Sequence, residues 1–120
     1  MLIREKDRQT LLQIFSTMDL PLDVWAYGSR VNGTAHDGSD LDLVIRSQTL
    51  KPFPLDKYAD LCEKIKESNI PILVELRDWA MLPESFHNNI VRQYEVLFSN
   101  KQSLVNEPPA DYKKKSDKKN

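Results

Sequence analysis

One stretch determines how this chain of 120 residues is built: Val24-Trp25-Ala26-Tyr27-Gly28-Ser29, then ten residues, then Asp40-Leu41-Asp42-Leu43-Val44-Ile45. Each half contains a short apolar run of the kind that favours a buried strand. Gly28-Ser29 follows the first run directly, and residues 30–35 suit a short helix or a turn. A glycine there lets a phosphate approach the backbone, and the start of the next helix offers unpaired N–H groups. The first half therefore predicts a strand followed by a phosphate-binding turn.

Asp40 and Asp42 stand two residues apart at the start of the second run. Because side chains alternate along a strand, both carboxylates are expected on one face, roughly 6.5–7 Å apart along the backbone. Two ionised carboxylates at the head of so apolar a strand repel each other unless a cation lies between them. Oxygen ligands of this kind suit hard cations such as Mg²⁺, which can bridge protein and triphosphate. The pair is the candidate metal clamp.

This order of elements resembles the signature Gly-Ser-x10-Asp-x-Asp of the DNA-polymerase-β-like nucleotidyltransferase superfamily. The run from Trp25 to Leu43 is similar to its small prokaryotic branch, the minimal nucleotidyltransferases (MNT), and the resemblance extends from about residue 23 to about residue 98. It implies a nucleotidyltransferase fold of the α/β (α+β) class, with a small mixed sheet packed against helices. Stand-alone MNT proteins of this length are similar to the antitoxin half of HEPN/MNT toxin–antitoxin pairs.

The resemblance implies that Asp40, Asp42 and a third carboxylate hold two Mg²⁺ ions, with ATP as the substrate. Glu75 is the candidate third ligand, because residues 74–79 look like the family's third strand. The family more often has Asp at this position, and the longer Glu side chain predicts a shifted or weakened metal site.

Two alternatives to this role of Glu75 stay open. Asp78 is the alternative ligand, although its parity along the strand is opposite to that of Glu75. Glu75 also has a purely structural alternative, in which its carboxylate pairs with Arg77 or with a lysine.

Gly28, Ser29 and Arg30 are the candidate nucleotide-binding residues. Ser29 is expected to bind a β- or γ-phosphate through its hydroxyl and its backbone N–H. Arg30 has two open roles, since its charge can serve the phosphates or its side chain can simply cover the helix surface. We expect Trp25 and Trp79 to belong to the core or to face a partner.

The composition, with 40% apolar and 29% charged residues, is that of an ordinary globular protein. We expect one minimal nucleotidyltransferase domain over residues 1–100 and a disordered Lys-rich tail over residues 101–120. The tail holds six Lys and three acidic residues, so the net charge of −1 for the whole chain leaves −4 on residues 1–100. Nucleic-acid binding needs a basic face, so no direct contact with nucleic acid is expected.

No apolar run is long enough to span a bilayer, and the first residues lack a signal-peptide core. We therefore expect no membrane association and a cytoplasmic location. The single Cys62 excludes an internal disulfide and is expected to be a small buried residue on a helix.

Periodicity and turn signals predict the remaining elements. They are a helix over 5–18; a helix over 56–68 with Asp56 as N-cap; a strand over 70–76 beside the second strand; a helix opened by Pro83 with Phe86, Ile90 and Tyr94 buried; and a core segment over 96–98.

The resemblance implies an Mg-dependent protein adenylyltransferase antitoxin, which transfers AMP from ATP to a tyrosine hydroxyl of a cognate HEPN RNase toxin and neutralises it. The alternative is a nucleotide-binding antitoxin that neutralises by complex formation without catalysis, with a site weakened by Glu75. A third reading is a half-enzyme that modifies a small molecule such as an aminoglycoside in a homo-oligomer. Since 120 residues leave no room for an acceptor-binding domain, the acceptor is expected on another molecule or a second copy.

Overall fold

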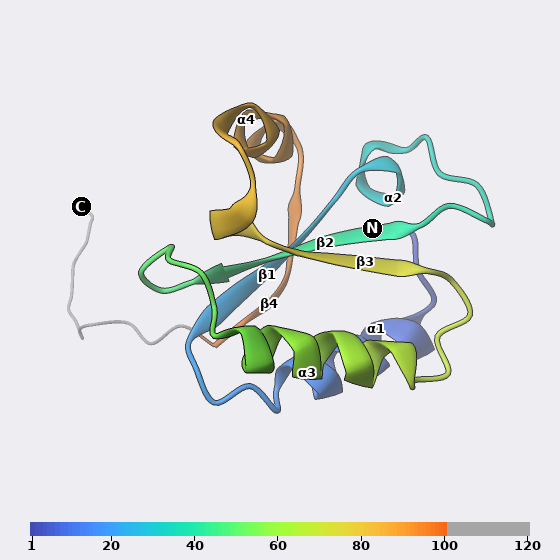
Figure 1. The fold of residues 1–120 in the computed structure, drawn as a ribbon. Helices are drawn as coiled ribbons and strands as arrows, with labels where there is room; N and C mark the ends of the chain where they lie inside the picture. Colours follow the sequence, from blue (N-terminus) through green and yellow to red (C-terminus); the bar gives the residue numbers. More distant parts are fainter. Residues whose placement is uncertain (101–120) are drawn as a thin grey trace, which may run out of the picture.

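The structure, a computed structural model, describes residues 1–100; the predicted tail over 101–120 lies outside the described residues. Figure 1 shows the order of the elements along the chain. They are α1 (Glu5–Phe15), β1 (Leu22–Tyr27), α2 (Ser29–Asn32), β2 (Leu41–Ser47), α3 (Leu55–Lys66), β3 (Val74–Asp78), the 3-10 turn η1 (Trp79–Met81), α4 (Glu84–Arg92) and β4 (Glu95–Ser99).

The four strands form one mixed sheet in the order β3-β2-β1-β4. β1 lies antiparallel to both β2 and β4, and β2 lies parallel to β3. A parallel pair needs a crossover connection, and α3 supplies it by carrying the chain across one face of the sheet. The predicted mixed sheet packed against helices is therefore confirmed.

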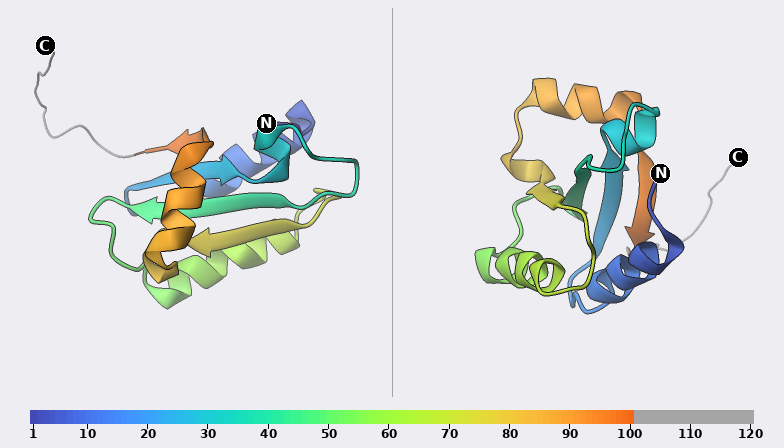
Figure 2. Two further views of the ribbon diagram at one scale, coloured as in Figure 1. Left: turned by 90° about the horizontal axis from the view of Figure 1, so that it is seen from above. Right: turned by 90° about the vertical axis from the view of Figure 1, so that its right-hand side faces the viewer.

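Helices cover the two faces of the sheet unequally (Figure 2). α1 and α3 lie side by side on one face, where they enclose the main core with inward residues of the strands such as Val24, Leu43 and Ile45. η1 and α4 lie on the other face, over a smaller apolar cluster that includes Trp25, Trp79 and Ile90. Within residues 1–100 no helix has the length and apolar character required to cross a membrane.

Several predicted boundaries differ from the observed ones. The first helix ends at Phe15, because the N–H groups of the next residues turn back in i→i+3 bonds, yet Met18 stays buried as expected. Asp56 is not the N-cap of α3, since that helix starts at Leu55 after the extended residue Pro54.

Two further differences lie in the second half of the chain. β3 covers 74–78 instead of the predicted 70–76, because its first residue, Val74, pairs with Leu41 at the beginning of β2. α4 ends at Arg92, and Tyr94 lies beyond it, where its ring stacks on Trp25 with centroids 3.9 Å apart. Ile90 is buried in the predicted stripe, whereas Tyr94 is exposed.

We expect Leu43→Ala to lower the free energy of unfolding by about 2–5 kcal/mol, because its side chain is fully enclosed in the main core and truncation leaves a cavity. Leu55→Ala is the matched control: it removes the same atoms from a side chain that is 79% exposed, so the change should stay within about 0.5 kcal/mol. Urea unfolding of both variants measures the difference. Similar losses in the two variants would contradict the assignment of the core.

Candidate active site

The first three strands bring three polar residues into one row across the sheet. In the backbone register Tyr27 of β1 is opposite Asp42 of β2, and Asp42 is opposite Glu75 of β3. Paired residues on neighbouring strands point to the same face, here the face covered by α4. The row lies where β1 ends and β2 begins, so two of the three predicted carboxylates, Asp42 and Glu75, are neighbours.

Arg77 extends from the next row into this one. It is opposite Val44 in the register, two residues beyond Glu75 and on the same face. Its guanidinium donates a hydrogen bond of 3.1 Å to Glu75 Oε1 and another of 3.1 Å to the Tyr27 hydroxyl. It also lies 3.5 Å from Asp42 Oδ1. Glu75 therefore pairs with Arg77, as the structural alternative has it, and at the same time lies opposite Asp42, as a third metal ligand would.

The electrostatics of the row centre on Asp42. Burial raises the pKa of its carboxyl; the Asp40 and Glu75 carboxylates raise it further, whereas the Arg77 guanidinium opposes them. Asp40 immediately precedes β2 and is exposed to solvent. A group held under these conditions is stabilised in its charged form by any additional cation.

Asp42 and Glu75 of the row, together with Asp40 just before β2, fit a hard divalent cation by their chemistry, since they offer only oxygen ligands. As they stand, however, no three Asp, Glu, His or Cys side chains within residues 1–100 are arranged to hold a metal ion. The guanidinium of Arg77 occupies the position between Asp42 and Glu75. The chain therefore has the donor set for a metal together with a side chain that competes for it.

Gly28 brings the turn after β1 against Asp42. Its backbone has φ 81° and ψ −157°, a region that residues with a side chain rarely adopt. A Cβ atom placed on Gly28 would lie 2.5 Å from Asp42 Oδ2. Two features of the structure therefore favour glycine at this position, the backbone conformation and the closeness of the carboxylate. Ser29 follows as the first residue of α2.

Arg30 is directed away from a role on phosphates. Its side chain is buried and donates to the backbone carbonyls of Leu2, Asp37 and Ser39, and more weakly to that of His36. The backbone N–H of Leu2 in turn donates to the carbonyl of Arg30. Neither sequence-based role, phosphate contact or cover of the helix surface, matches this arrangement. Arg30 instead ties the loop before Asp40 to the start of the chain.

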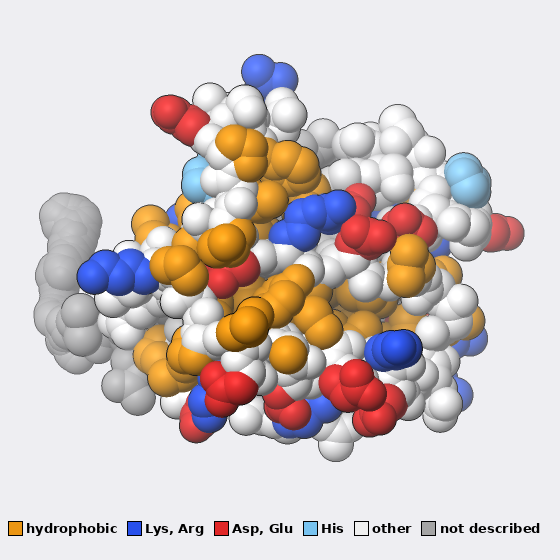
Figure 3. Space-filling model, viewed as in Figure 1, with side chains coloured by type: hydrophobic (Ala, Val, Ile, Leu, Met, Phe, Trp, Pro, Cys, Tyr) orange, Lys and Arg blue, Asp and Glu red, His pale blue; other side chains and the backbone are white. Residues whose placement is uncertain are grey.

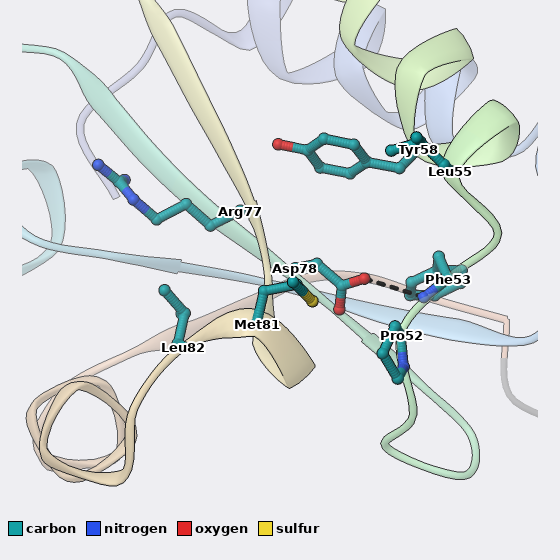
Figure 4. Close-up of a pocket in the computed structure, with 8 residues that line it drawn as sticks. All are labelled: Pro52, Phe53, Leu55, Tyr58, Arg77, Asp78, Met81 and Leu82. Atoms are coloured by element: carbon teal, nitrogen blue, oxygen red, sulfur yellow. Dashed lines mark hydrogen bonds between the residues drawn. The ribbon is translucent and has the colours of Figure 1, made fainter.

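Asp78 lies on the opposite face from the row, as its parity indicates. Its carboxylate accepts hydrogen bonds from the backbone N–H groups of Phe53, at 2.9 Å, and Ala80, at 3.1 Å. Figure 4 shows this carboxylate pointing to Phe53 while the Arg77 side chain extends away from it. Asp78 therefore holds the loop before α3 in place and does not join the carboxylates of the row.

The pocket in Figure 4 has a volume of about 390 Å³ and lies beside the end of β3. Its lining is mostly apolar and includes Phe53, Tyr58 and Leu82, together with Arg77. Leu55 and Met81 also line it and are 79% and 70% exposed. Figure 3 shows an apolar band on this face, with acidic and basic side chains gathered next to it. Arg77 thus contacts both the polar row and the apolar pocket.

Sequence reasoning missed a stack of rings and cations beneath α4. The Arg46 guanidinium lies 4.0 Å from the ring centroid of Trp25 and 4.5 Å from that of Trp79. The ring of His87 stacks on Trp79 with centroids 3.8 Å apart. Both tryptophans are buried, as expected for core residues. No local pattern marks the stack, because its members come from strands and helices far apart in the sequence.

Comparison with known proteins gives a consistent family. Residues 9–103 match the family described as Polymerase beta, Nucleotidyltransferase. The chain is 44% identical over 89 residues to the probable protein adenylyltransferase MntA of Haemophilus influenzae, which covers 72% of this chain and 74% of the relative.

Two crystal structures share the fold. A chain of a toxin–antitoxin with AMP-PNP is 18% identical, with a TM-score of 0.63 over 78% of this chain and 74% of that one. A chain of a mutant of the toxin–antitoxin MntA–HpeT is 20% identical, with a TM-score of 0.60 over 82% of this chain and 75% of that one. At these identities the likeness concerns the fold alone.

We expect Arg30→Met to lower the free energy of unfolding by about 1.5–3 kcal/mol, since several backbone carbonyls lose the charged donor that a buried guanidinium supplies. Arg8→Met is the control, because within residues 1–100 the Arg8 side chain forms an exposed pair with Glu5, at 3.6 Å, and its loss should cost less than about 1 kcal/mol. Urea unfolding compares the two variants. Equal losses would show that the carbonyl contacts of Arg30 carry no stability.

Proposed function

We propose, because the chain belongs to the polymerase beta nucleotidyltransferase family, that it transfers AMP from ATP to a tyrosine hydroxyl of a partner toxin of the HEPN RNase type. The modified toxin is neutralised, so the chain acts as an antitoxin. The observation that carries this proposal is the close approach of the Gly28 turn to Asp42, which puts a residue without a side chain directly beside the row of carboxylates.

Each residue of the site has a role in this reaction. Asp40, Asp42 and Glu75 would hold Mg²⁺, which when bound neutralises triphosphate charge and favours loss of the acceptor's proton. Gly28 leaves the backbone open to the phosphates, and the Ser29 hydroxyl donates a hydrogen bond to one of them. Arg30 acts indirectly, since it fixes the loop that leads into Asp40.

The reaction forms one bond and breaks one. The tyrosine oxygen bonds to the α-phosphorus of ATP, the bond between that phosphorus and the oxygen bridging to the β-phosphate breaks, and pyrophosphate and a proton leave. The chain's contribution is to hold the triphosphate between the turn and the row so that the acceptor approaches in line.

A protein acceptor is favoured over a nucleic acid by charge and by the relatives. Residues 1–100 carry a net charge of −4, given that residues 101–120 hold six Lys against three acidic residues, so they lack the overall positive charge that binds a phosphate backbone. The relative from Haemophilus influenzae is a probable protein adenylyltransferase, and both structural neighbours come from toxin–antitoxin crystals, one of them with AMP-PNP. We further propose that residues 1–100 make up the whole catalytic domain, with 101–120 as an appended tail.

One observation favours a second candidate function. The pairing of Glu75 with Arg77 leaves the third carboxylate engaged by a side chain of the protein itself. A chain that kept this arrangement with nucleotide bound would neutralise the toxin by complex formation alone.

The test uses the purified partner toxin with ATP labelled at either the α- or the γ-phosphate. We expect label on the toxin from the α position only, and an increase in toxin mass by one or more AMP units. Asp42→Asn should abolish labelling, because it removes a ligand charge while the side chain keeps its size. Label from the γ position would make the chain a kinase. Neutralisation without any label would favour the second candidate.

Gly28→Ala should weaken ATP binding about tenfold or more, because the added methyl group meets Asp42 Oδ2. Gly33→Ala is the matched control. Gly33 also has a positive φ, 87°, but its ψ of 6° lies in the left-handed helical region, and a Cβ atom there has nothing within 4 Å. Its variant therefore carries less backbone strain than Gly28→Ala and leaves the site undisturbed. Calorimetric titration with Mg·ATP compares them. If the two variants bound Mg·ATP with equal affinity, the Gly28 turn would not be part of the phosphate-binding site.

A further inference from the structure

Arg77 is placed where a bound metal ion would compete with it. Its guanidinium contacts one oxygen of Asp42, one oxygen of Glu75 and the Tyr27 hydroxyl, at 3.5, 3.1 and 3.1 Å. These two carboxylates come from β2 and β3 and are opposite each other in the register. The guanidinium takes one oxygen of each carboxylate, and a divalent cation held by the same two carboxylates would be repelled by its positive charge, so the two cations compete for the pair.

The contacts of Arg77 are of the kind that can be exchanged. Its side chain is 36% exposed, and its separation from Asp42 is longer than that of a strong charged pair. Phe86 of α4 lies against it, with the guanidinium carbon 5.8 Å from the ring centroid. On its other side Arg77 borders the pocket of about 390 Å³, so there is space for the side chain to move into.

The attraction that holds the Arg77 side chain in place depends on the charge of the carboxylates that face it. Facing the guanidinium are Asp42 and Glu75, with the Tyr27 hydroxyl from β1 and the Phe86 ring from α4. When a cation neutralises these carboxylates, the attraction that holds Arg77 is lost. Phosphate oxygens then become the stronger partners for a guanidinium, which binds them in the same forked geometry.

We propose that Arg77 is a built-in counter-cation of the acidic row, which keeps metal alone from binding and is displaced when metal arrives together with the triphosphate. This inference rests on the proposed metal- and nucleotide-dependent function. Arg77 is a positioning residue in this scheme: it sets the order of binding and stabilises Asp42 and Glu75 as neighbours while the row holds no metal ion.

The experiment measures Mn²⁺ binding without nucleotide, from the electron paramagnetic resonance signal of free Mn²⁺. Arg77→Met should bind Mn²⁺ about tenfold or more tightly than the parent chain, because a competing charge is removed from the two carboxylates. Arg8→Met is the matched control, since the Arg8 side chain is partly exposed on α1 and pairs with Glu5 of the same helix. It removes the same charge without contact to the row, and its affinity should stay within about twofold.

A second measurement uses the parent chain and does not depend on the folding of a variant. In ¹⁵N spectra of the arginine side chains, Mg²⁺ with a non-hydrolysable ATP analogue should shift the Nε–H resonance of Arg77, and Mg²⁺ alone should shift it much less. Unchanged or weaker Mn²⁺ binding by Arg77→Met, or an Arg77 resonance indifferent to Mg²⁺ and nucleotide together, would overturn the proposal. Absence of AMP transfer with these binding results intact would instead count against the proposed function.

Discussion

The antiparallel pairing of β1 with β2 is the interaction on which the rest of this structure depends. It joins the end of β1 to the beginning of β2, so that Tyr27 is opposite Asp42 and the turn at Gly28 closes against the Asp42 carboxylate. The parallel addition of β3 then brings Glu75 beside Asp42. A slip of one residue in either pairing would turn Asp42 or Glu75 to the opposite face and dismantle the row. The main core enforces the register, since Leu43 and Ile45 must stay inside.

The two faces of the sheet differ in composition: one carries the main apolar core, and the other carries the candidate site. The face under α1 and α3 is packed with aliphatic side chains, and its residues include the largest fully enclosed ones, such as Phe15 and Leu11. The other face carries aromatic rings, arginines and carboxylates beneath a single helix, α4. The polar groups of the row are paired through Arg77. The Nε atom of Arg46 on the same face, in contrast, is buried without a hydrogen-bond partner among the described residues, and its guanidinium lies against the Trp25 and Trp79 rings.

The parts of the site that the sequence predicts are those that depend on local order. Strand alternation is sufficient to separate Asp78 from Glu75, and an apolar run that ends in Gly-Ser is sufficient to indicate a turn after the strand, whereas the choice of Glu75 comes from the resemblance to the family's third strand. The partners of the Arg30 and Arg77 side chains cannot be predicted in this way, because they come from parts of the sequence that only the folded packing brings together. Nothing near Arg30 in the sequence indicates that Leu2 will accept its hydrogen bond. The start of β3 differs from the predicted one for the same reason, because it follows its pairing partner Leu41.

The arrangement around Arg30 bears on how this protein can change over generations. The guanidinium recognises the loop of residues 36–39 through main-chain carbonyls, which every amino acid carries. The contact with Arg30 therefore does not depend on which side chains the loop carries, although Ser39 Oγ and His36 Nδ1 accept backbone hydrogen bonds within the loop. An insertion or deletion, in contrast, would move the carbonyls out of register with the guanidinium. Among natural variants of the chain, we therefore expect Arg30 and the length of this loop to be kept more strictly than the identity of the loop's side chains.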